Sequence, residues 1–111
     1  MSRKKSSKDW YTHNIGIVLR TLREHKNWSQ EAVAQSLGDE IGRDNICQST
    51  IYRIEAGMYV ITVERLILLA KVFKVCPQKI LAKVVTCENG RIHLSPQDVC
   101  ELLDSTLSID E

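Results

Sequence analysis

The sequence contains no apolar run that approaches the ~20 residues needed to cross a membrane, so we expect no membrane-spanning segment. Its basic N-terminus is not followed by an apolar stretch and therefore lacks the pattern of a secretory signal. A chain of 111 residues is long enough for one domain with a modest core of its own. These features predict a single globular domain that works in the cytoplasm.

The cysteines form no Cys-x-x-Cys pair, and the histidines are equally scattered. The positions concerned are Cys47, Cys76, Cys87, Cys100, His13, His25 and His93. Such spacing indicates neither a zinc site nor a disulfide framework, so we expect free thiols and no cofactor. The sequence also lacks a nucleophile–base motif and a Gly-rich phosphate loop, which leaves an enzymatic function with little support.

Charge is distributed unevenly along the chain. Residues 1–83 contain 14 Lys or Arg and 8 Asp or Glu, whereas residues 84–111 contain one Arg and 6 acidic residues. A basic body with an acidic tail suits a protein that binds a polyanion. The first nine residues are especially basic, with Arg3, Lys4, Lys5 and Lys8. They are either a solubilising tail or an arm that follows a phosphate backbone.

The stretch 47–57 predicts a short amphipathic helix that ends at Gly57, since glycine adopts positive φ without steric cost. Ile51 and Ile54 fall on one face of this helix. The opposite face carries Gln48, Ser49, Tyr52 and Arg53. Carboxamides pair with adenine edges and guanidiniums with guanine edges, so this face is either a DNA-reading surface or a solvated one.

Apolar periodicity and capping residues predict further helices. One helix is expected over about 14–26 and a second over 30–37 after the cap Ser29. The helix within 47–57 is then the third, and the cap Thr62 is expected to start a fourth. Gly38 is expected to end the second helix, and residues 39–46 to form a polar loop. Proline is favoured at the first helical position, so Pro77 is expected to start a short helix that runs to about residue 83.

The tail has a different pattern. Asn89-Gly90 lies between two runs containing β-branched residues, 84–87 and 91–94, which predicts a β-hairpin. Ser95-Pro96 then predicts the start of a last helix with an apolar face. The expected organisation is a basic flexible arm (1–9), a helical domain (10–83) and an extension made of a hairpin and a helix (84–111).

Residues 15–81 resemble the lambda-repressor/Cro-type helix-turn-helix domain, the family that includes Xre-type regulators. The residues that carry the resemblance are Ile15-Gly16, Arg23, Ser29-Gln30-Glu31, Val33-Ala34, Leu37-Gly38, Gln48-Ser49-Thr50-Ile51, Arg53-Ile54-Glu55-Ala56-Gly57 and Ala70. The resemblance implies a five-helix bundle whose third helix is the recognition helix. The expected fold is therefore all-α, a five-helix lambda-repressor-like bundle with an added C-terminal β-hairpin and helix.

The resemblance also implies roles for individual residues. Gln48, Ser49, Tyr52 and Arg53 are expected to contact bases. Gln30 is expected to meet a phosphate and to brace Gln48, and Arg23 is expected to form a partly buried ion pair with Glu55. The loop after Gly57 carries only the Tyr59 hydroxyl where the family often has Lys, Arg or Asn. The expected phosphate contacts are Ser29, Gln30, Arg20, Arg43, Tyr59, Arg3, Lys4 and Lys5.

The turn before the expected recognition helix is longer than is usual in the family and resembles the elongated turn of POU-specific domains. It is acidic, because Asp39, Glu40 and Asp44 outnumber Arg43, so we expect its tip to point away from DNA. Acidic residues near this turn touch RNA polymerase in lambda-type repressors. By resemblance, Glu31, Asp39 and Glu40 are candidates for such a contact, and the alternative is a solvated acidic loop.

The favoured function is a sequence-specific regulator that binds double-stranded DNA. The alternative is a protein-interaction module, antitoxin-like or an adaptor, that keeps the fold without specific DNA binding. Proteins of this type usually bind twofold sites as two copies. An isolated hairpin needs a surface to pack on, either the chain's own body or a second subunit, and we expect a homodimer through residues 84–107.

Overall fold

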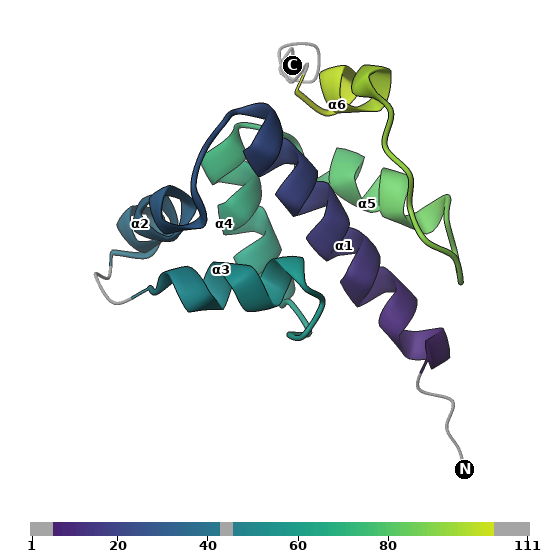
Figure 1. The fold of residues 1–111 in the computed structure, drawn as a ribbon, viewed down its shortest axis with the longest axis horizontal. Helices are drawn as coiled ribbons and strands as arrows, with labels where there is room; N and C mark the ends of the chain where they lie inside the picture. Colours follow the sequence, from purple (N-terminus) through teal and green to yellow (C-terminus); the bar gives the residue numbers. More distant parts are fainter. Residues whose placement is uncertain (1–5, 43–45, 104–111) are drawn as a thin grey trace.

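The computed structural model describes residues 6–42 and 46–103 (Figure 1). These residues form six helices: α1 (Ser6–His25), α2 (Gln30–Ile41), α3 (Gln48–Glu55), α4 (Val63–Phe73), α5 (Pro77–Val85) and α6 (Pro96–Leu103). In this part of the chain no helix is long and apolar enough to span a membrane. Arg3, Lys4, Lys5, Arg43 and Asp44 lie outside the described residues.

The core forms around α1, which runs through the centre of the molecule with α2, α3 and α4 on one side and α5 on the other (Figure 1). The apolar stripe predicted on α1 is confirmed, because its members are all buried: Ile15, Val18, Leu19 and Leu22. The stripe predicted on α4 is buried as well: Leu66, Leu69, Ala70 and Phe73. Burial of these side chains supplies the main driving force for the bundle.

The first helix begins at Ser6, about two turns earlier than the apolar pattern predicted. Two polar residues, Thr12 and Asn14, lie on its buried face with side chains 7% and 1% exposed. Trp10 is partly buried and packs against the core. Polar residues on the inner face break the apolar periodicity, and the pattern therefore missed this part of α1.

The second helix does not end at Gly38, as the sequence predicted, but continues to Ile41. Gly38 is buried inside the helix, and Gly42 ends it in the left-handed conformation (φ 83°) with its N–H donating to the Gly38 carbonyl. The side chains of Asp39 and Glu40 are therefore exposed on the last turn of α2 instead of in a loop. The connection to α3 is correspondingly shorter than expected.

The predicted helix caps are present. The Ser29 hydroxyl accepts a 3.0 Å hydrogen bond from Ala32 N–H, and the Thr62 hydroxyl accepts one of 3.0 Å from Arg65 N–H. Ser95 and Asp98 form a reciprocal capping box, in which each side chain accepts from the other's backbone N–H. These local signals fixed the starts of α2, α4 and α6 correctly.

The predicted β-hairpin is wrong, because the described residues contain no strand. Residues 84 and 85 extend α5, where Ile80 and Val84 form one buried stripe against the core. Asn89 adopts positive φ (62°) and makes a turn, as the Asn-Gly signal indicated, but no second strand follows it. The turn is held instead by the side chain of Asn14 on α1.

The last helix covers the chain's own core. Val99 and Leu102 of α6 are buried together with Ile92 of the preceding segment. On the neighbouring α5, the Lys83 ammonium contacts the carboxylates of Asp98 and Glu101, each at 2.9 Å. The apolar face that suggested a subunit contact is therefore already buried within one chain.

Candidate nucleic-acid interface

The third helix lies at an edge of the molecule, with one face packed inward and the other free (Figure 1). Ile51 and Ile54 are buried, at 2% and 4% exposure, whereas Tyr52 is 52% exposed. Gln48, Ser49 and Arg53 are exposed as well. The single carboxylate of α3, Glu55, is turned inward with a side chain 5% exposed. The free face is therefore uncharged or positive along its whole length.

A close helix crossing fixes the position of α3. A Cβ atom on Gly16 of α1 would lie 2.6 Å from the carbonyl oxygens of both Ile54 and Glu55. Real Cβ atoms do not approach backbone oxygens so closely, so only glycine permits this distance between α1 and α3. Gly16 entered the sequence argument only through the family resemblance, and its packing role appears in the three-dimensional contact alone.

The chain reverses tightly at the C-terminal end of α3. Gly57 has φ 76°, its N–H donates to the Ile54 carbonyl, and the Met58 N–H donates to the Arg53 carbonyl. This is a Schellman motif with Gly57 in the left-handed position, as the sequence predicted. The His13 ring of α1 lies directly against Gly57, where a Cβ would be 2.6 Å from Nδ1. The end of α3 is therefore closely packed on α1.

Arg23 and Glu55 form the ion pair that was expected between α1 and α3. Arg23 Nε donates to Glu55 Oε2 at 2.6 Å, and Nη2 donates to Oε1 at 3.1 Å. A third guanidinium N–H donates to the Trp28 carbonyl at 2.9 Å. The hydrogen bonds to Glu55 raise the pKa of Arg23 further above its ordinary value. The pair thereby ties α1, α3 and the turn before α2 together.

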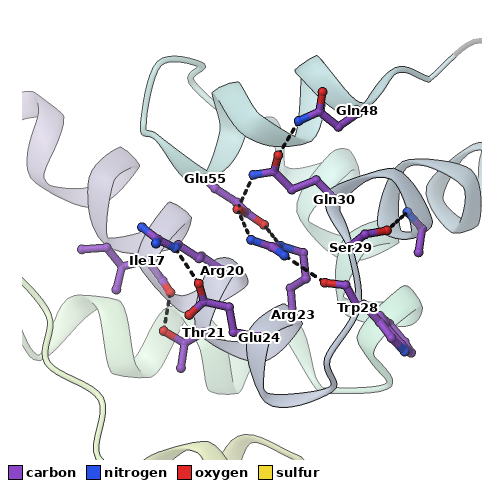
Figure 2. Close-up of polar contacts among 11 residues, drawn as sticks. Ile17, Arg20, Thr21, Arg23, Glu24, Trp28, Ser29, Gln30, Gln48 and Glu55 are labelled. Atoms are coloured by element: carbon purple, nitrogen blue, oxygen red, sulfur yellow. Dashed lines mark hydrogen bonds and ion pairs between the residues drawn. The ribbon is translucent and has the colours of Figure 1, made fainter.

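Gln30 extends this network to the start of α3 (Figure 2). Its Nε2 donates to Glu55 Oε1 at 2.9 Å, and its Oε1 accepts from Gln48 Nε2. An ionised carboxylate only accepts, so Gln30 must direct its NH₂ group to Glu55 and its oxygen to Gln48. Gln48 consequently keeps one N–H and its Oε1 for an external partner, the donor–acceptor pair that an adenine edge complements.

At the other end of α3, Arg53 and Tyr59 lie together. Arg53 Nη1 donates to the Tyr59 hydroxyl at 3.3 Å, and the guanidinium carbon is 6.0 Å from the ring centroid. Both side chains are exposed. A residue expected to contact a base and one expected to contact a phosphate are thus neighbours, and each restricts the motion of the other.

The other described residues for which contacts were expected lie on α1 and α2 and not on α3. Arg20 is exposed on α1 and pairs with Glu24 at 3.0 Å. It also lines a shallow hollow of about 200 Å³ together with Gln30 and Tyr52. The side chains of Glu31, Asp39 and Glu40 are exposed on α2. A contact of these three residues with RNA polymerase stays a prediction.

A model of the helix-turn-helix family matches residues 19–80, which run from the second half of α1 into α5. This match covers more than half of the chain, so the chain belongs to the helix-turn-helix family, in its Cro/C1 and Xre-like branch. The protein is therefore a DNA-binding transcription regulator by class. The searches of curated proteins and of solved structures gave no match.

Proposed function

We propose that this protein is a sequence-specific transcriptional regulator that reads the DNA major groove with α3. The observation that carries this proposal is the chain of contacts from Arg23 through Glu55 and Gln30 to Gln48. A solvated surface has no need to orient an exposed carboxamide. Here the exposed amide of Gln48 is fixed by a buried ion pair, which is how a base-reading group is preorganised before binding.

The free face of α3 supports a division of roles. In this proposal Gln48 pairs with an adenine and Arg53 with a guanine, since these groups bond bidentately to those bases. Ser49 can donate to or accept from either, and the Tyr52 ring suits a thymine methyl or a sugar. The proposed phosphate contacts within the described residues are Ser29, Gln30, Arg20 and Tyr59.

Two copies are expected on a twofold operator, because one helix-turn-helix unit reads only a few base pairs. Self-association through residues 84–107, of which the structure describes 84–103, stays a proposal, and its basis is narrower than the apolar pattern suggested. Since Val99 and Leu102 are buried in their own chain, such a contact would use the exposed faces of α5 and α6. Light scattering of the full chain, alone and with operator, measures the number of copies bound.

One observation favours a second candidate, a protein-interaction module. Met58 and Val60, in the loop where the family often holds phosphate, are 64% and 77% exposed. Exposed apolar side chains next to the recognition helix suit a protein partner better than a phosphate. An antitoxin-like or adaptor protein would bind DNA weakly and with little dependence on salt.

The test begins with selection of bound sites from a random DNA pool. Binding of the selected operator is then compared for wild type, Gln48→Ala and Arg53→Ala, with Gln35→Ala, an exposed amide on α2, as the matched control. We expect each α3 variant to lose about 1–3 kcal/mol on the operator, with relaxed preference at one position. Binding to random DNA should change little. Failure to enrich any sequence, or equal losses of Gln48→Ala on both DNAs, would contradict the proposal.

A further inference from the structure

The acidic extension contains one cation, Arg91, among residues 84–111. Two of its acidic residues, Asp98 and Glu101, are bound to Lys83 between α5 and α6. Arg91 lies apart from that cluster and is exposed. Within the described part of the chain it has no ion-pair partner. Within the described residues, two acids of the extension are thus bound to Lys83, whereas its cation, Arg91, forms no ion pair.

Arg91 lines a groove of about 680 Å³ between α1, the C-terminal end of α3 and the turn 86–91. On one side the groove is lined by Trp10, His13 and Ile17 of α1, and on the other by Ala56 after α3. Arg20, Glu55 and Ala56 also line the smaller hollow that contains Gln30 and Tyr52. One continuous surface therefore leads from the base-reading helix to Arg91.

The carboxylates along this surface are already neutralised. Glu55 is bound by Arg23, and Glu24 is bound by Arg20 at 3.0 Å. Glu88, the remaining acid of the turn, is exposed and does not line the groove. The free charge that the groove presents to an incoming polyanion is therefore the guanidinium of Arg91.

The backbone on both sides of Arg91 is fixed to α1. The Gly90 carbonyl accepts from Asn14 Nδ2 at 3.0 Å, and the Ile92 N–H donates to Asn14 Oδ1 at 2.9 Å. Asn14 is only 1% exposed, so the bond to Ile92 is buried and the bond to Gly90 is partly buried. The backbone that carries Arg91 is therefore already ordered before a ligand binds, and only the side chain has to be immobilised.

We propose that Arg91 binds a phosphate of the DNA backbone next to the bases read by α3, so that the extension is part of the DNA-binding surface. This inference rests on the proposed DNA binding and adds a contact outside the family match at residues 19–80. A guanidinium binds phosphate oxygens bidentately and keeps its charge at every physiological pH. The contact adds affinity without sequence preference, since phosphate carries no base information.

The experiment measures the dissociation constant of the full chain on operator and on random duplexes of equal length over a range of salt concentrations. Arg91→Gln should weaken both complexes by roughly 3- to 10-fold at low salt and reduce the salt slope by about 0.9, the loss of one neutralised phosphate. Arg91→Lys should recover most of the slope. Lys71→Gln, which removes a cation from the last turn of α4, is the matched control and should leave the slope unchanged.

A second readout locates the contact. Neutral methylphosphonates placed singly along the operator should include one position that weakens wild type but leaves Arg91→Gln unaffected. An unchanged salt slope in Arg91→Gln, or the absence of such a position, would overturn the inference. The outcome is separable from the proposed function, because Gln48→Ala should weaken binding to the operator only, whereas Arg91→Gln should weaken binding to both DNAs.

Discussion

The side-chain Oδ1 of Asn14 accepts a hydrogen bond of 2.9 Å from the backbone N–H of Ile92, 78 positions further along the chain. Its Nδ2 donates to the carbonyls of Gly90, at 3.0 Å, and Cys87, at 3.4 Å. One buried polar side chain thus satisfies the backbone of the turn that follows α5. It takes the place that a partner strand would have in a hairpin.

Replacing Asn14 with alanine should destabilise the protein. The Ile92 N–H would lose its acceptor inside the protein, and an unsatisfied buried group costs about 1–3 kcal/mol. Urea unfolding of Asn14→Ala should show this loss, together with faster proteolysis in the 86–92 turn. Gln78→Ala, an exposed amide on α5, is the control. A midpoint equal to that of wild type would show that the turn is held by other contacts.

Removing one partner of the Arg23–Glu55 pair should destabilise the protein far more than removing one partner of the exposed Arg20–Glu24 pair. Glu55→Ala leaves the Arg23 guanidinium, 14% exposed, without its carboxylate and should cost about 3–5 kcal/mol. Glu24→Ala breaks the pair with Arg20, whose side chains are 62% and 54% exposed, and should cost within about 0.5 kcal/mol. Thermal melts compare the two variants, and similar melting temperatures would count against the buried pair.

The close approach of α1 and α3 predicts that two glycine-to-alanine changes differ in their effect on stability. Gly16→Ala forces a methyl group against two carbonyl oxygens at 2.6 Å and should destabilise by about 1–3 kcal/mol. It should also weaken operator binding, since α3 must shift. Gly90→Ala places the methyl 3.7 Å from the Cys87 carbonyl, an ordinary contact, and should be nearly neutral. Equal stability of the two variants would refute the crossing argument.

The docking of α6 should weaken in acid. Hydrogen bonds from the Ser95 backbone N–H and from Lys83 lower the pKa of Asp98 from its ordinary 3.8 to about 2. A lowered carboxyl pKa adds stability that is present above pH 3.8 and is lost as pH falls through about 2. Melting temperatures of wild type and Asp98→Asn should therefore converge over this range. Parallel curves would show that the ionised carboxylate does not stabilise the fold.

Local patterns in the sequence predicted much of the helical domain. Apolar periodicity located the buried faces of α1, α3 and α4, and Ser29, Thr62 and Gly57 marked helix ends correctly. These features are predictable because each depends on residues three to five positions apart. The pairing of Arg23 with Glu55 joins residues 32 apart, and it was predicted from the family resemblance together with their positions beside apolar helix faces.

Tertiary structure decided the rest. The first turns of α1 escaped prediction because the inner face of the helix is polar at Thr12 and Asn14. Burial of Asn14 is favourable only when the 86–92 turn supplies its partners. The same contact decided against the hairpin, since the backbone of residues 90–92 bonds to a distant side chain instead of a neighbouring strand. The position of Arg91 in the groove that α1 shares with the end of α3 follows from that contact as well. Local sequence patterns alone determined the central segments of the helices and their apolar faces, whereas hydrogen bonds between distant residues determined how the extension is held.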